Sequence, residues 1–283
     1  LRNKNSVVFA FQANIYCVLL CKILKIKVII RSNSSPSGWD HNFIKKYVYK
    51  KIVSKADSIV VNSLQFKSQM WSELNLKTEC IYNPLSISNV KKMSKKGRKE
   101  SFFKNNNTLK LINIGRFTDQ KDQITILRAI NYLKKQLNFK LILIGYGNKK
   151  QELIKFVEEN HLSKFVKVDD KILNPYRVLA QSDVFILSSK FEGLPNVLLE
   201  AAALKKFIIS TKCQSGPKEI LLNGKGGLFF KIGDYKDLSN KILFYSKNKR
   251  KLSKKIQASF KNLDKYEYHK NLEKYYGLVS RFI

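Results

Sequence analysis

The sequence predicts an α/β protein made of two open domains with parallel sheets. Short runs rich in Val and Ile alternate with stretches of helical periodicity along most of the chain. These runs are apolar throughout, which is typical of strands buried on both faces of a parallel sheet. A segment dense in Lys, Ser and Asn, at residues 86–107, divides the alternating pattern into two series.

The first series predicts a domain over residues 1–107 whose last part, 86–107, is a Lys-rich linker. Its expected strands are 6–11, 27–31, 58–62 and 78–83, and its expected helices are 13–25, 40–55 and 64–74.

The second series predicts a domain over residues 108–264, followed by an aromatic-rich helix within 265–283. Its expected strands are 109–115, 139–145, 165–168, 183–188 and 207–211. Its expected helices are 121–136, 148–160, 174–181 and 195–204, with further helical stretches near 234–247 and 250–262. In open α/β sheets, ligands bind beyond the carboxyl ends of the strands, so candidate site residues are sought at that edge.

Composition excludes several classes of protein. The chain has 283 residues, of which 44% are hydrophobic and 12% aromatic, so it can bury ordinary cores and is not a disordered chain. It contains no run of 18 apolar residues, so no transmembrane helix is predicted. Its four cysteines form no Cys-x-x-Cys pair, which favours buried thiols in a reducing cytoplasm.

The formal net charge of +33 is spread over both halves of the chain and comes from 46 Lys but only 8 Arg. Dedicated readers of nucleic acid rely on arginine forks, so nucleic-acid binding is not expected. The charge indicates either a solvated basic surface or attraction to an anionic substrate or membrane.

One stretch, SSKFEGLPNVLLEAAAL at 188–204, places a carboxylate at the end of a predicted strand. Glu192 lies in the turn, and Gly193, Leu194, Pro195 and Asn196 open the next helix, with Pro195 expected as its first residue. Free N–H groups at a helix N-terminus favour an anion. An anionic ligand is therefore expected at this turn.

A second glutamate, Glu200, follows in the same helix among Val, Leu and Ala residues. A carboxylate in apolar surroundings is costly unless it is hydrogen-bonded, and vicinal hydroxyl groups of a ligand would satisfy it. The alternative is an ordinary exposed glutamate on an amphipathic helix.

The segment INIGRFTDQKD at 112–122 places two cations after the strand-ending Gly115. Arg116 offers a planar fork for a phosphate and Lys121 a point charge. At the same sheet edge as Glu192, they would face a diphosphate. The alternative is a pair of surface cations in a Lys-rich protein.

Together these motifs resemble the family-4 type of retaining, nucleotide-sugar-dependent glycosyltransferases, which have the GT-B fold of two Rossmann-like domains facing a cleft. The resemblance rests on INIGRFTDQKD, LILIGYGNKKQEL, NPYRVLAQSDVFILSSKFEGLPNVLLEAAAL and TKCQSGPKEIL, in order over residues 109–232. The first domain matches more weakly, through RSNSSP, VNS and CIYNPL.

The resemblance implies a role for each matching residue. Arg116 and Lys121 would grip the donor diphosphate and stabilise the leaving group, and Glu192 would bind hydroxyl groups of the donor sugar. Backbone N–H groups at 193–196 would support the sugar and phosphate. Glu200 would hold the ribose, and the loop at 169–173 would meet the base. No metal or other cofactor is implied, and the last helix, within 265–283, would cross back to the first domain.

Several other motifs receive a plainer interpretation. Asp169 and Asp170 are expected in an exposed loop, and LIGYGN at 143–148 as a tight strand–helix turn. In SGPKEIL, Lys218 or Glu219 would touch the donor, or the segment is a structural turn. His41 is a further candidate for the acceptor side of the cleft.

The resemblance also suggests that the beginning of the first domain is missing. Two leading strand–helix units would amount to about 60–80 residues, at roughly 30 per unit. The expectation is an incomplete first domain with an exposed sheet edge and a tendency to aggregate.

The function expected from the resemblance is transfer of a sugar from a nucleotide diphosphate sugar, UDP being the favoured nucleotide, to a glycan or lipid-linked glycan. The setting would be bacterial surface-polysaccharide synthesis in the cytoplasm, at the inner face of the membrane. Two alternatives stay open: a catalytically incomplete binding subunit, and a charge-driven nucleic-acid binder.

Overall fold

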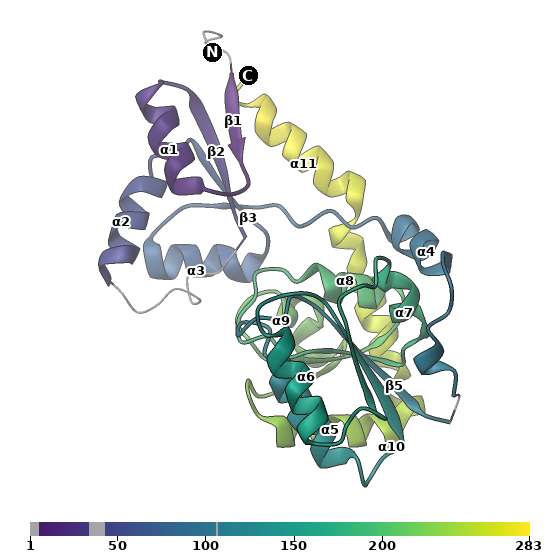
Figure 1. Cartoon of the computed structure of the whole chain (residues 1–283). Coiled ribbons are helices and arrows are strands. Elements are labelled where there is room, and N and C mark those ends of the chain that lie inside the picture. Colours follow the sequence, from purple (N-terminus) through teal and green to yellow (C-terminus); the bar gives the residue numbers. More distant parts are fainter. Residues whose placement is uncertain (1–5, 34–42, 106) are drawn as a thin grey trace.

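The computed structural model describes residues 6–33, 43–105 and 107–283, which form two α/β units (Figure 1). The sheet of the first unit has the strand order β1-β2-β3-β4, and that of the second has the order β10-β9-β8-β5-β6-β7. All the strand pairings within both sheets are parallel. The predicted α/β class with parallel sheets is therefore confirmed.

The first unit alternates strands and helices as its sequence pattern indicates. The helix α3 begins where the Ser63 hydroxyl accepts the N–H of Phe66 at 3.1 Å, and it ends at Asn75, which has a left-handed φ of 51°. The strand predicted for 78–83 is shorter, because only Glu79 and Cys80 extend the sheet before the chain leaves it. The elements are β1 (Val7–Ala10), α1 (Asn14–Ile23), β2 (Lys27–Ser32), α2 (Phe43–Val53), β3 (Ser58–Val61), α3 (Leu64–Leu74) and β4 (Glu79–Cys80).

The last helix, α11 (Tyr268–Ser280), lies against the first unit although it follows the second in the sequence (Figure 1). Leu278 of α11 forms one buried cluster with Ile29, Val60 and Ile81 of the first unit. One face of the first sheet is thus covered by the end of the chain.

Residues 86–107 contain a helix, α4 (Ile87–Lys95), where the sequence predicts a linker. The Ser86 hydroxyl caps it by accepting the N–H of Asn89 at 3.2 Å. Val90 is buried in a core cluster of the second unit, while the lysines of α4 are exposed. The abundance of lysine conceals this amphipathic pattern, because the face of α4 that meets the core has few apolar residues, chiefly Val90 with Ile87 beside it.

The second unit contains the larger sheet and most of the buried core. The strand β10 was not predicted from the sequence, because its three residues, Leu228–Phe230, gain their pairing only from β9. The two stretches predicted near 234–247 and 250–262 are one helix, α10, interrupted at Asn248, where φ is −125°. The elements are β5 (Leu109–Ile114), α5 (Gln123–Leu133), β6 (Phe139–Ile144), α6 (Lys150–Glu159), β7 (Val166–Asp169), α7 (Pro175–Gln181), β8 (Val184–Leu187), α8 (Asn196–Ala203), β9 (Phe207–Thr211), α9 (Pro217–Ile220), β10 (Leu228–Phe230) and α10 (Tyr235–Lys261).

Among the helices of the described ranges, every one is too short or too polar to traverse a lipid bilayer.

Glycines allow the loops after β5 and β6 to touch. A Cβ added to Gly145 would lie 1.9 Å from the carbonyl oxygen of Gly115, and one on Gly147 would lie 2.3 Å from that of Phe117. Gly147 also has a φ of 148°, which side chains rarely adopt. LIGYGN is thus a packing turn that supports the loop carrying Arg116.

We expect Gly145→Ala to lower the free energy of unfolding by at least about 2 kcal/mol, because its new methyl group meets backbone that cannot move aside. The matched control is Gly277→Ala in α11, where a Cβ meets no atom within 4 Å. That change should stabilise the helix by roughly 0.5–1 kcal/mol. Urea unfolding of the whole chain measures both, and equal effects of the two variants would contradict the close approach.

Candidate functional site

Two loops at the carboxyl edge of the second sheet build the candidate site. They follow β5 and β8, which are neighbours in the sheet although the paired residues Ile112 and Phe185 are 73 positions apart in the sequence. The Gln120 side-chain amide donates to the carbonyl of Phe191 at 3.0 Å, and the Ser188 hydroxyl donates to the carbonyl of Lys121 at 2.6 Å. These hydrogen bonds hold the two loops in one fixed arrangement.

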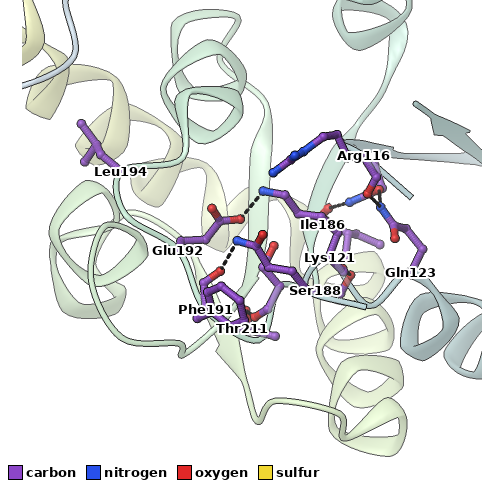
Figure 2. A network of polar contacts seen from close by, with 12 residues as sticks. Arg116, Lys121, Gln123, Ile186, Ser188, Phe191, Glu192, Leu194 and Thr211 are labelled. Carbon is purple, nitrogen blue, oxygen red and sulfur yellow. Dashed lines mark hydrogen bonds and ion pairs between the residues drawn. The ribbon is translucent and has the colours of Figure 1, made fainter. Parts of the chain in front are cut away.

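An ion pair joins the same loops at their centre. Nζ of Lys121 lies 2.6 Å from Oε1 of Glu192, and their side chains are only 17% and 7% exposed (Figure 2). A buried carboxylate is costly without a partner, so the ammonium group of Lys121 stabilises the Glu192 carboxylate in this position. The pair places an acceptor of hydrogen bonds and a cation side by side at the sheet edge.

Arg116 lies on the rim of the site. Its carbonyl accepts a hydrogen bond from the Gln123 side chain at 3.0 Å, which fixes its backbone. Its side chain is exposed, has no polar partner among the described residues and extends over the Lys121–Glu192 pair (Figure 2). Arg116 is therefore available to an anionic ligand, whereas Lys121 is already neutralised by Glu192.

The turn after Glu192 presents backbone N–H groups. Within the part of the chain that the structure describes, the N–H groups of Gly193, Leu194 and Asn196 have no acceptor. The helix α8 begins at Asn196, one residue later than predicted, because Pro195 adopts an extended ψ of 107° at the cap. These free donors at a helix N-terminus can bind an anion.

Glu200 lies further along α8 and has a partner that the sequence analysis did not identify. Its Oε1 accepts the hydroxyl of Tyr176, from α7, at 3.1 Å. Burial raises the pKa of Glu200, and burial together with the nearby carboxylate raises the pKa of Tyr176 to about 12. Pro175 at the start of α7 is a local signal for that helix, but no spacing in the sequence relates Tyr176 to α8.

The first unit closes against the Glu192 turn. A Cβ on Gly193 would lie 2.2 Å from the carbonyl oxygen of Asn33, so the two units touch at this glycine. The Asn83 amide donates to the carbonyl of Leu194 at 3.2 Å and to the side chain of Asn196. Asn33 and Asn83 lie in RSNSSP and CIYNPL, which the sequence analysis noted only as weak family matches and gave no role, because contacts between units leave no periodic signal.

Glu219 is a second point of closure rather than part of the site. It accepts the Tyr82 hydroxyl and, at 3.0 Å, the N–H of Leu64, both from the first half of the chain. Lys265 lies 3.5 Å from it. The structural interpretation of SGPKEIL therefore holds for Glu219, whose carboxylate is occupied by contacts between the units.

Asp169 and Asp170 were predicted to lie in an exposed loop, but Asp169 is the last residue of β7 and its side chain is only 15% exposed. Asp169 pairs with Lys167 at 2.9 Å, and Asp170 pairs with Lys150 at 2.6 Å. In residues 6–33, 43–105 and 107–283, no group of three or more His, Cys, Asp or Glu side chains is arranged to hold a metal ion. Leu173, in the loop expected to meet a base, is 98% exposed, and His41 lies outside the described residues.

Comparisons with known proteins agree on one family. The family model described as "Glycosyl transferases group 1" matches residues 94–262. An uncharacterized glycosyltransferase of Methanocaldococcus jannaschii is 32% identical over 219 residues, 72% of this chain and 53% of that protein. The Campylobacter jejuni N-acetylgalactosamine-N,N'-diacetylbacillosaminyl-diphospho-undecaprenol 4-alpha-N-acetylgalactosaminyltransferase is 28% identical over 229 residues, 77% of this chain and 60% of that protein.

Among solved structures, Anabaena HepE in complex with UDP has a TM-score of 0.81 at 17% identity, covering 98% of this chain and 79% of that one. This similarity confirms the predicted GT-B fold. The chain spans 53% and 60% of the lengths of the two curated relatives above.

We expect Lys121→Met to lower the free energy of unfolding by about 3 kcal/mol, because it leaves the Glu192 carboxylate buried without its partner. Adding Glu192→Gln should recover most of the loss, since no buried charge then remains. The control is Lys155→Met, which removes a pair whose side chains are 75% and 60% exposed and should cost less than about 1 kcal/mol. Denaturant unfolding of the four chains measures this, and similar losses for the two lysines would refute the buried pair.

Proposed function

Since the chain belongs to the glycosyl transferases group 1 family, we propose that it transfers a sugar from a nucleotide diphosphate sugar, with UDP as the nucleotide, to a glycan or lipid-linked glycan acceptor. The proposal rests on the groups that converge at the carboxyl edge of the second sheet. There, Arg116, the Lys121–Glu192 pair and free N–H groups of the Glu192 turn converge. This is a set of groups suited to a sugar diphosphate.

The positive groups bind the diphosphate. Arg116 supplies an unpaired fork, and the N–H groups of Gly193, Leu194 and Asn196 supply donors at a helix N-terminus. When a diphosphate enters, Lys121 shares its charge between Glu192 and the phosphate. Positive charge at these positions stabilises the leaving group without requiring a metal ion, because fixed cations and dipoles perform that task in a site shielded from water.

The two glutamates bind hydroxyl groups. Glu192, fixed by Lys121, accepts hydrogen bonds from the donor sugar beside the reacting carbon. Glu200, fixed by Tyr176, accepts them from the ribose. Gly115, the residue after β5, lies next to the Lys121 side chain, since a Cβ added there would be 3.8 Å from it, and we place it beside the phosphate. A carboxylate that accepts hydroxyl groups in a desolvated site contributes more than it would in water.

The reaction exchanges one bond at the anomeric carbon. The bond from that carbon to the diphosphate oxygen breaks, and its electron pair stays with the diphosphate. The acceptor hydroxyl oxygen forms the new bond on the same face, so the configuration is retained, and its proton goes to the departing diphosphate. Arg116 and Lys121 stabilise the charge that develops on the diphosphate, which is where electrostatic catalysis has its largest effect.

The names of the relatives and one surface of the first unit support the acceptor class and the setting that we propose. The Campylobacter jejuni relative is named for an acceptor linked to diphospho-undecaprenol, and a Staphylococcus aureus relative for capsular polysaccharide biosynthesis. We place this protein in bacterial surface-polysaccharide synthesis, on the cytoplasmic side of the membrane.

A basic, apolar surface on the first unit supports contact with the membrane. The neighbouring helices α1 and α2 expose large apolar side chains, and lysines lie among them. Ile23 is 76% exposed, Phe43 is 86% exposed and Tyr47 is 58% exposed. Lysines beside exposed aromatic side chains favour the surface of an anionic bilayer.

We expect UDP to bind the chain in preference to GDP and ADP, and Glu200→Ala to weaken UDP binding by about 10- to 100-fold through loss of hydrogen bonds to a charged group. Calorimetric titration at moderate salt measures this. The matched control is Glu159→Ala, whose side chain is 60% exposed in α6 and should leave binding unchanged.

Three results of that titration separate the alternatives. UDP binding without turnover of any UDP-sugar would favour a catalytically incomplete binding subunit. Equal binding of all three nucleotides, unchanged by Glu200→Ala and abolished by salt, would show that the positive charge of the chain, and not a specific site, binds them. A specific, Glu200-dependent affinity for UDP supports the proposed donor site.

We also expect the chain to sediment with vesicles of phosphatidylglycerol but not with vesicles of phosphatidylcholine. The double variant Ile23→Glu/Tyr47→Glu should lower the bound fraction about tenfold or more, because it removes apolar contact and adds negative charge. The control is Tyr132→Glu, on the second unit, where the side chain is 50% exposed. Equal loss for Tyr132→Glu would show that net charge alone, and not the α1–α2 surface, governs sedimentation.

A further inference from the structure

A pocket of about 520 Å³ lies between the two units, and it is called the cross-unit pocket below. Nearly all of its lining comes from the first unit, at the ends of β1 and β2 and the starts of the segments that follow them. The second unit contributes the side chain of Arg116. The lining residues that matter are Phe11, Asn14, Tyr16, Arg31, Tyr49 and Arg116. The pocket thus adjoins the candidate site through Arg116.

The charged side chains that line the pocket, among the residues that the structure describes, are arginines. Of the lining residues that the structure describes, Arg31 and Arg116 are the ones that carry a charge, and neither Asp nor Glu is among them. The chain has 46 Lys but only 8 Arg, so two arginines at one pocket are unusual for this composition. A guanidinium fork matches the planar or tetrahedral oxygens of a carboxylate or phosphate better than an ammonium group does.

Arg31 is held rigidly in the wall of this pocket. Its guanidinium carbon lies 5.7 Å from the ring centre of Phe11 and 5.8 Å from that of Tyr275, and one of its terminal nitrogens donates to the side chain of Asn83. A guanidinium group positioned in this way loses little entropy when it binds an anion.

Two buried polar atoms at the pocket lack partners among the described residues. Nε of Arg31 is a donor without an acceptor, and Oδ1 of Asn14 is an acceptor without a donor. The Asn14 amide nitrogen is already committed to the carbonyl of Arg31 at 2.9 Å. Unpaired buried groups are unusual and call for a partner. A ligand that satisfies both would bring an anionic oxygen and a hydroxyl group together.

Aromatic side chains complete the recognition surface. Phe11 is 50% exposed and Tyr16 is 71% exposed, so both rings are accessible at the pocket. Such rings bury the apolar C–H face of a sugar, while the polar groups around them bind its hydroxyl groups. Arginine, aromatic rings and an amide are together suited to a charged sugar rather than a neutral one.

We propose that the cross-unit pocket is the acceptor subsite, and that it selects a sugar bearing an anionic group, phosphate or carboxylate. This proposal rests on the proposed glycosyltransferase function, since it places the acceptor beside the donor residue Arg116. Arg31 binds the anionic group, Asn14 accepts a hydroxyl group, and Phe11 and Tyr16 face the ring.

The test compares three matched probes: methyl α-glucoside, its uronate and its 6-phosphate. Each is titrated into the full chain, with and without saturating UDP, and followed by saturation-transfer NMR at 0.15 M salt. We expect the anionic probes to bind at least about tenfold more tightly than the neutral glycoside, as a desolvated charge pair would give. The stronger of the two anionic probes identifies phosphate or carboxylate as the group selected.

Substitutions at Tyr16 test the pocket without disturbing the fold, because this side chain is exposed. Tyr16→Glu should bring the affinity for the anionic probes down to that for the neutral one by repulsion, while Tyr16→Gln should retain the difference. Tyr132→Glu adds the same charge on the second unit and should change nothing. Arg31→Met should act like Tyr16→Glu, and circular dichroism establishes that each variant is folded.

The proposal is overturned if neutral and anionic probes bind alike, or if Tyr132→Glu lowers their affinity as much as Tyr16→Glu does. UDP binding in the same samples reports separately on the donor site. Loss of UDP binding with retained preference for anionic sugars would remove the proposed function while leaving an anionic-sugar site. UDP binding without a preference for anionic sugars would overturn the anionic-sugar site while leaving the proposed function in place.

Discussion

The candidate site depends on one buried ion pair, between Lys121 and Glu192, which lie in different loops of the second unit. Burying both charges costs free energy of desolvation. Their mutual attraction offsets this cost only if their geometry is fixed, because a loosely held pair attracts more weakly. The fixing comes from neutral hydrogen bonds around the pair, such as those made by Gln120 and Ser188. The loops are therefore rigid before any ligand arrives, and the cost of ordering them is met during folding.

Closure of the two units is the second constraint on the site. The backbones of the two units approach closely at Gly193, and the Asn83 side chain donates a hydrogen bond across the interface. The Glu219 carboxylate of the second unit also accepts hydrogen bonds from the first. The helix α11 adds apolar contact by covering the first sheet after the chain has left the second. Polar contacts of this kind are exchangeable with water, so the units are joined more weakly than either is held together internally. Such an interface allows the two units to move relative to each other.

The sequence predicted regular elements well wherever apolar residues repeat with a single period. It failed where a few residues decide the structure. The helix α4 was read as a linker because one buried valine, Val90, was outnumbered by lysines. The strand β10 was missed because three residues carry no period of their own. Pro195 was placed one residue too far into α8, because a proline fits either the cap or the first helical position.

By itself, the sequence determined the α/β class, the parallel sheets and the residue types at the sheet edge, because periodicity and strand-ending glycines are local properties. Only the tertiary structure decided which of those residues meet. It paired Lys121 with Glu192 and Tyr176 with Glu200, and it brought Arg31 of the first unit near Arg116 of the second. These encounters follow from strand order and from the packing of one unit on the other, which no spacing along the chain encodes.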